Sequence, residues 1–198
     1  NYRTSHQIRS QADMLLPSAL SDVDGNDESR QGTISVFDGL PPTIRTFKSI
    51  DTESKAVGEW IKGLLKDGLL AHEIGVFVRS NAQVSRAHVA VESANIKWID
   101  LDGTPEGRRE HVSVCTMPIV KGMEFRAVAV MACDDEIVPL QERIESASDE
   151  SELEEVYLTE RHLLYVACTR ARDYLIVTGI APISEFIDDM KTYKQNMM

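Results

Sequence analysis

The sequence predicts an α/β fold, in which helices cover both faces of a parallel sheet, and three observations support this prediction. Short apolar runs of the kind that form buried strands recur along the chain. Segments whose apolar residues repeat at helical spacing separate these runs, and parallel strands require such connections. The length of 198 residues and the hydrophobic content of 42% are sufficient for one domain with a sizeable core.

The first part of the chain is expected to contain two helices, a long loop and a strand. Residues 4–16 suit a short helix that Pro17 ends. Residues 18–42 are rich in Ser, Asp and Gly and are expected to form a surface loop. A strand is expected at residues 43–47. Residues 51–70 then suit a helix, because they place apolar side chains at helical spacing: Val57, Trp60, Ile61, Leu64 and Leu65.

The rest of the chain continues this alternation of strands and helices. Further strands are expected at residues 74–78, 111–116, 127–133 and 174–177. Helices are expected at residues 82–94, 154–171 and 183–190. Sheets built in this way bind ligands beyond the carboxyl ends of their strands, so a site is expected there.

The negative charge of the chain is concentrated in one stretch. The formal net charge is −11, and residues 134–160 hold eleven acidic residues and a single base, Arg143. The remaining residues are nearly neutral and show no basic stripe. Charge therefore neither excludes nor predicts contact with DNA.

The cysteines and the hydropathy indicate a cytoplasmic protein. Cys115, Cys133 and Cys168 form no CxxC pair and are expected to be reduced core thiols. No apolar run approaches the roughly 18 residues of a membrane span and no signal-peptide pattern is present, so no membrane partner is expected. The chain starts with Asn1 instead of Met, as is expected of a piece cut from a longer protein.

The most informative segment is ERHLLYVACTRAR, residues 160–172. It places Arg170 and Arg172 at the end of an apolar helix, beside the strand expected at residues 174–177. An arginine held rigidly there is suited to reach an anionic ligand, and a surface salt bridge is the alternative. The chain contains no G-x-x-x-x-G-K-[ST] loop, the usual phosphate cradle. The segment is therefore expected to form one wall of a site that other sequence completes.

This segment resembles the last signature motif of UvrD/Rep-type superfamily 1 DNA helicases. Other stretches resemble motifs of the second, C-terminal RecA-like domain of that family, and they follow the family's order. Asn1-Tyr2-Arg3 resembles the fourth motif, and TMPIVKGMEF, residues 116–125, resembles the fifth. Residues 75–83 resemble the block between these motifs, and residues 181–187 resemble the closing segment. The resemblance implies that residues 1–198 form one RecA-like domain that lacks the P-loop.

The resemblance assigns half of a nucleotide site to this chain. Arg170 matches the arginine finger on the γ-phosphate, and Arg3 matches an arginine that touches the terminal phosphate. Tyr2 would pack on the adenine, and Glu124 would accept a hydrogen bond from a ribose hydroxyl after a tight turn at Gly122. ATP and Mg²⁺ would be held mainly by an N-terminal RecA-like domain of the same polypeptide. No metal ligand is expected in this chain.

The resemblance also implies a contact with single-stranded DNA. Thr116 and nearby backbone amides would contact DNA phosphates, although Pro118 stands where the family usually has histidine. Arg79 is expected either near the DNA or in a structural role. A loop at residues 99–110 stands where family members usually insert a large accessory domain.

The implied function is that of the C-terminal motor domain of an ATP-dependent translocase or helicase on single-stranded DNA, as in DNA repair. The isolated chain is expected to be inactive, because the P-loop and the Mg²⁺ ligand lie outside it. In one alternative, the acidic residues 141–155 of a non-catalytic, helicase-like module recruit a basic protein. In another, the longer protein also carries a nuclease. The run Asp134-Asp135-Glu136 imitates the end of a magnesium-binding strand but is not expected to bind metal, since no P-loop precedes it.

Overall fold

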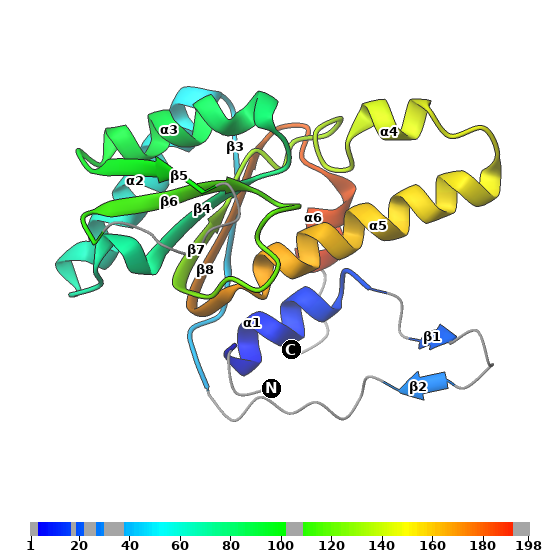
Figure 1. The fold of residues 1–198 in the computed structure, drawn as a ribbon, viewed down its shortest axis with the longest axis horizontal. Helices are drawn as coiled ribbons and strands as arrows, with labels where there is room; N and C mark the ends of the chain where they lie inside the picture. The colour runs from blue at the N-terminus through cyan, green and yellow to red at the C-terminus, as the bar shows by residue number, and fades with distance from the viewer. Residues whose placement is uncertain (1–3, 17–18, 22–26, 30–37, 102–108, 192–198) are drawn as a thin grey trace.

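The computed structural model describes residues 4–16, 19–21, 27–29, 38–101 and 109–191, and it confirms the α/β fold. Six strands form one parallel sheet in the order β3-β8-β7-β4-β6-β5, flanked by helices (Figure 1). The strands of the sheet are β3 (Thr43–Phe47), β4 (Ile74–Val78), β5 (Lys97–Asp100), β6 (His111–Thr116), β7 (Phe125–Val130) and β8 (Ala171–Ile180). The helices are α1 (His6–Asp13), α2 (Ile50–Lys66), α3 (Val84–Ser93), α4 (Gln141–Glu145), α5 (Glu150–Cys168) and α6 (Glu185–Lys191).

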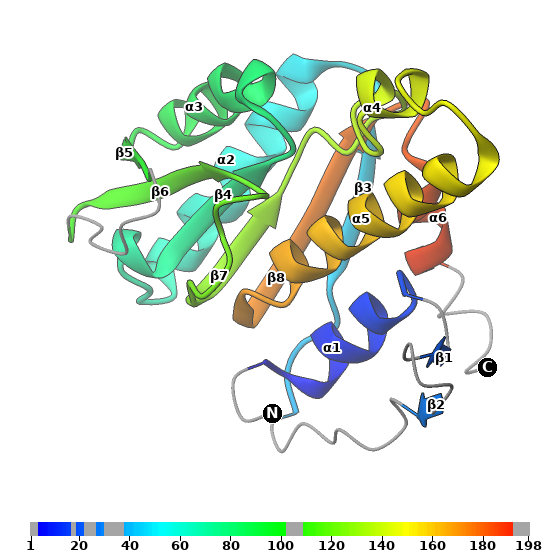
Figure 2. The same ribbon diagram turned by 45° about the vertical axis from the view of Figure 1, so that its right-hand side comes forward.

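The sheet separates two layers of core packing. Along β4, Phe77 faces one layer while Val76 and Val78 face the other, as the two-residue period of a strand requires. Helices α1, α5 and α6 cover the face of Phe77, and Figure 2 shows α1 and α5 together on that side. Helices α2 and α3 cover the opposite face. The sheet is therefore buried on both faces, as the continuous apolar strands predict.

The long helices begin at side-chain caps. Before α2, the Ser49 hydroxyl accepts a hydrogen bond from the Thr52 amide at 3.3 Å, and the Thr52 hydroxyl accepts one from the Ser49 amide at 3.2 Å. Before α5, the Asp149 carboxylate accepts a hydrogen bond from the Glu152 amide at 2.9 Å. Caps of this kind satisfy amides that lack a partner within the helix.

The structure corrects one boundary and adds several elements that the sequence did not predict. Strand β8 begins at Ala171, so Arg172 is a strand residue and not a charge at the helix end. Strand β5 was missed: the loop expected at residues 99–110 overlaps its second half. The expected loop at residues 18–42 contains a hairpin of β1 (Ala19–Ser21) and β2 (Asp27–Ser29). Helix α4 and two 3₁₀ turns, Ala71–Glu73 and Asn81–Gln83, were also not predicted. These elements are short, so they give almost no periodic signal.

Within the described ranges, no helix combines the length and the apolar character that a membrane crossing requires.

Candidate functional site

The two central residues of the predicted nucleotide site lie at the amino ends of neighbouring strands. Glu124 directly precedes β7 and Arg170 directly precedes β8, and the amide of Phe125 donates to the carbonyl of Arg170 at 3.0 Å. The site was expected at the carboxyl ends, and this expectation is wrong for these residues. Residues 117–124 return from the carboxyl end of β6 to the amino end of β7. The two ends of the fifth-motif stretch therefore lie at opposite ends of the strands.

Arg170 is held between α5 and the segment before β7. Its Nε donates to the carbonyl of Val166 at 3.1 Å, and its Nη1 donates to the carbonyl of Met123 at 3.2 Å. The first bond caps the carboxyl end of α5, where a cation is also favoured by the helix dipole. These contacts restrict the orientation of the guanidinium and connect the two motifs.

A cavity of about 310 Å³ opens beside Arg170. Residues from α1, from the segment before β7 and from the end of α5 line it: Thr4, Arg9, Met123, Glu124, Tyr165, Thr169 and Arg170. The Thr4 hydroxyl donates to the carbonyl of Thr169 at 3.0 Å and joins two of these segments. Among the described residues, the charged lining consists of two guanidiniums and one carboxylate, so the cavity favours an anion.

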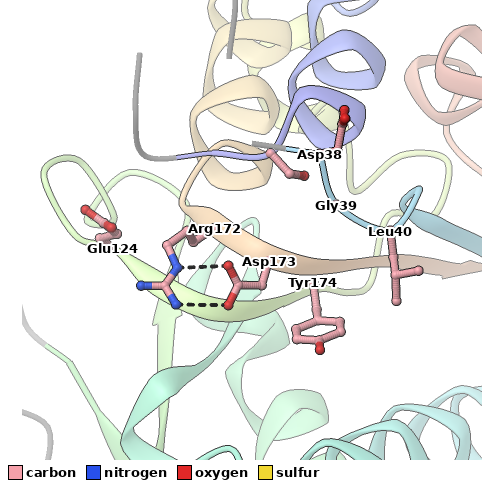
Figure 3. Close-up of a pocket in the computed structure, with 8 residues that line it drawn as sticks. Asp38, Gly39, Leu40, Glu124, Arg172, Asp173 and Tyr174 are labelled. Atoms are coloured by element: carbon pink, nitrogen blue, oxygen red, sulfur yellow. Dashed lines mark hydrogen bonds and ion pairs between the residues drawn. The ribbon is translucent and has the colours of Figure 1, made fainter. Parts of the chain in front are cut away.

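A second cavity of about 550 Å³ also has Glu124 in its lining (Figure 3). Its lining is Ser5, Asp38, Gly39, Leu40, Glu124, Arg172, Asp173 and Tyr174. Arg172 donates to both carboxylate oxygens of Asp173, at 2.8 and 3.0 Å, and these hydrogen bonds lower the pKa of Asp173. With three carboxylates and one guanidinium among the described residues of its lining, this cavity disfavours phosphate and suits groups that donate hydrogen bonds.

Gly122 has the backbone conformation that the predicted tight turn requires. Its φ is +87°, in the left-handed region that favours glycine. A Cβ built at this position would meet no atom within 4 Å, so the requirement is conformational and not one of space.

Thr116 lies at the carboxyl end of its strand, whereas Arg170 lies at the amino end of β8. Thr116 ends β6, is 7% exposed, and lines a shallow cavity of about 260 Å³ together with Asn81 and Asp100. The predicted DNA contact and the predicted nucleotide contacts are thus separated by the length of the strands. Tyr2 and Arg3, the residues of the fourth motif, lie outside the described residues.

The contacts of Arg79 show a structural role, which is one of the two roles expected for it. Its Nε and Nη2 donate to the two carboxylate oxygens of Glu160, each at 2.6 Å, and the Arg79 side chain is 7% exposed. Arg143 and the amide of Leu140 donate to the same carboxylate at 3.0 and 3.3 Å. Glu160 occupies the edge of the Arg79 guanidinium formed by Nε and Nη2, so a contact of Arg79 with DNA stays a prediction.

Acidification is expected to weaken the fold in part through Glu160. Burial acts to raise the pKa of Glu160, but Arg79 and Arg143 lower it below the ordinary 4.5. A carboxyl whose pKa is lowered on folding stabilises the native state above its unfolded pKa, and this contribution is lost as the pH falls. In urea unfolding between about pH 7 and pH 3, wild-type stability should fall more steeply than that of Glu160→Gln. Glu154→Gln, exposed on the same helix, should keep the wild-type slope; equal slopes for wild type and Glu160→Gln would contradict this role.

The run Asp134-Asp135-Glu136, which imitates the end of a magnesium-binding strand, pairs through Asp134 with an arginine. Asp134 accepts hydrogen bonds from Nη1 and Nη2 of Arg86 at 2.6 and 3.1 Å. Nε of the same guanidinium donates to Glu53 at 2.6 Å. In the ranges that the structure describes, no cluster of His, Cys, Asp and Glu is arranged to hold a metal ion. Sequence reasoning missed Glu53 and Arg86, since each is an ordinary helix residue until the fold brings the helices together.

The three cysteines are free and buried, which agrees with the prediction of core thiols. Burial raises the pKa of Cys115 and of Cys168 to about 12, and it raises the pKa of Cys133 well above its ordinary value. All three are therefore protonated and poorly nucleophilic at neutral pH.

Comparisons with known proteins agree with the motifs and the fold. Residues 100–181 match the family described as the UvrD-like helicase C-terminal domain, a stretch that includes Thr116, Glu124 and Arg170. The structure is similar to one described as the C-terminal domain of a possible DNA helicase from Lactobacillus plantarum WCFS1, with a TM-score of 0.64 and 18% identity. The alignment covers 96% of this chain and 94% of that chain, and at this identity it shows the fold alone. No curated protein sequence matches the chain.

Proposed function

We propose that this chain, whose residues 100–181 match the UvrD-like helicase C-terminal domain, is the second motor domain of an ATP-dependent translocase or helicase on single-stranded DNA. The observation that carries the proposal is the meeting of Glu124 and Arg170 at one cavity. They belong to two separate motifs, and each directly precedes one of two adjacent strands.

The charges of the two cavities support one orientation of the nucleotide. The phosphate chain would enter the smaller cavity, where Arg170 contributes positive charge next to the space that it would fill. Glu124 lines both cavities, so it would accept a hydrogen bond from a ribose hydroxyl at their junction. The acidic lining of the larger cavity, with Asp38 and Asp173, would repel a phosphate placed there.

The remaining parts of the reaction would come from a partner domain. The chain has no P-loop, so an N-terminal RecA-like domain of the same polypeptide would hold ATP and Mg²⁺ and position the attacking water. When the two domains close, the guanidinium of Arg170 would lie beside the transferred phosphoryl group and stabilise its negative charge. Thr116, at the carboxyl end of β6, would contact the backbone of single-stranded DNA.

A second candidate function is the recruitment of a basic protein by the acidic residues 141–155. One observation favours it: Leu153, Tyr157 and Leu158 line a shallow surface cavity together with Glu150 and Glu154. Leu158 is 45% exposed, so the start of α5 presents apolar and acidic groups side by side. A partner with a basic, amphipathic helix would match this surface. This candidate takes the lead if the longer protein does not hydrolyse ATP.

The isolated chain is expected to show no ATP hydrolysis, whereas the longer protein should hydrolyse ATP faster when single-stranded DNA is added. The reason is that half a nucleotide site supplies neither the phosphate cradle nor the metal. Phosphate release measured for both proteins, with and without DNA, tests the proposal. Saturable ATP turnover by the pure chain would refute the assignment of the P-loop to another domain.

A further inference from the structure

Arg9 lines the cavity of Arg170 but belongs to none of the stretches that resemble helicase motifs. It lies in α1, and its side chain is 15% exposed. Its charged neighbour is Asp13, with Nε of Arg9 and Oδ2 of Asp13 3.7 Å apart, which is too long for a hydrogen bond. Among the described residues, the buried Nε of Arg9 has no hydrogen-bond partner.

The guanidinium of Arg9 has unmet donor capacity among the described residues. Buried polar groups in folded proteins are almost always hydrogen-bonded, because an unsatisfied donor retains its desolvation penalty. Arg170, in the same cavity, uses Nε and Nη1 in bonds to backbone carbonyls. Arg9 has no such backbone contacts among the described residues, and its fork of donors suits the oxygens of a phosphate.

We propose that Arg9 is a second phosphate-binding side chain of the cavity, and that it contacts the polyphosphate of a bound nucleoside triphosphate beside Arg170. The inference rests on the proposed function for the identity of the nucleotide. Among the described residues of the lining, Arg9 and Arg170 outweigh the one carboxylate, that of Glu124.

The alternative is that Arg9 serves only as the helix partner of Asp13. Asp13→Asn removes that partner and leaves the cavity lining unchanged, since Asp13 does not line the cavity. Arg9→Gln removes the charge but keeps an unbranched polar side chain. The two variants therefore separate phosphate binding from the ion pair of α1.

The test is titration of inorganic tripolyphosphate into the 198-residue chain at low ionic strength, followed by NMR chemical shifts. Low ionic strength is chosen because salt screens the attraction between charges. Arg9→Gln should weaken binding at least about tenfold, the loss expected for a charge-assisted hydrogen bond. Arg170→Ala should weaken it too, and Asp13→Asn should bind as wild type does. Unfolding in urea confirms that each variant is folded.

The outcomes distinguish this inference from the proposed function. Equal binding by wild type and Arg9→Gln overturns the role of Arg9, and so does an absence of binding by the wild-type chain. If Arg9→Gln binds more weakly while the longer protein never hydrolyses ATP, the phosphate site stands and the proposed motor function fails.

Discussion

Replacement of Arg170 by alanine in the longer protein is expected to lower kcat of DNA-stimulated ATP hydrolysis about a thousandfold or more. An arginine finger stabilises charge that develops on the transferred phosphoryl group, so its loss raises the barrier of the chemical step. The contacts of Arg170 with Val166 and Met123 hold the guanidinium beside the cavity in advance, and such preorganisation strengthens electrostatic stabilisation. DNA binding should be retained, since Thr116, the predicted DNA contact, lies at the opposite ends of the strands from Arg170.

Two further variants make the Arg170 experiment specific. Arg170→Lys keeps one charge but not the fork of donors, so it should restore only part of the rate. Arg45→Ala removes an exposed arginine from the edge strand β3, outside both cavities, and should leave kcat unchanged. If Arg170→Ala is folded and hydrolyses ATP as fast as wild type, the proposed mechanism is wrong. If neither protein hydrolyses ATP, the acidic interaction surface becomes the leading candidate.

Replacement of Arg86 by methionine is expected to lower the free energy of unfolding by about 3 to 5 kcal/mol. Arg86 is 5% exposed and holds two buried carboxylates, Glu53 at 0% and Asp134 at 7% exposure. Burial acts to lower the pKa of Arg86, but Asp134 and Glu53 raise it above its ordinary value, so the guanidinium stays charged. Methionine would leave both carboxylates buried without their counter-charge.

The same carboxylates connect several elements, which increases the expected loss. The second oxygen of Glu53 accepts hydrogen bonds from the hydroxyl of Thr178 at 2.7 Å and from the amide of Ala132 at 3.1 Å. Asp134 accepts a hydrogen bond from the amide of Ile180 at 2.7 Å. The network therefore joins α2 and α3 to the carboxyl ends of β7 and β8.

Urea unfolding of the isolated chain measures the effect of Arg86→Met. Lys62→Met is the matched control, because it breaks the surface ion pair with Glu59 on α2 and should cost less than about 1 kcal/mol. Arg86→Lys should lie between wild type and Arg86→Met, since an ammonium group cannot bond both carboxylates in the same way. A loss below about 1 kcal/mol for Arg86→Met would show that this network does not stabilise the fold.

Most long elements could be predicted because their signal is local. The apolar run at Ile74–Val78 and the helical spacing in Ile50–Lys66 lie within single windows of the sequence, and both appear as expected. Strand β5 escaped prediction because it has four residues, two of them exposed at the sheet edge, and thus no clear alternation. Arg172 was assigned to the helix because the motif runs continuously across the boundary between α5 and β8.

Two residues of the proposed site could be named from the sequence, but their place in the sheet could not. Glu124 and Arg170 stand in motifs that can be recognised in the sequence, and the structure brings them to one cavity. Their position at the amino ends of the strands was not foreseen, since the general rule for parallel sheets favours the carboxyl ends. Arg9 carried no signal, because one arginine on a short helix resembles any exposed basic residue.

By itself, the sequence determined the alternation of strands and helices, the buried character of the sheet and the residues of the two helicase-like motifs. These are properties of neighbouring residues, set by side-chain volume, polarity and period. Only the tertiary structure decided at which ends of the strands the residues of the proposed nucleotide half-site lie. It also decided that Arg79 pairs with Glu160, that Arg86 joins Glu53 to Asp134, and that Arg9 reaches the cavity of Arg170. Each of these depends on contacts between segments far apart in the chain, which arise only when the crossovers close and burial makes every charge require a partner.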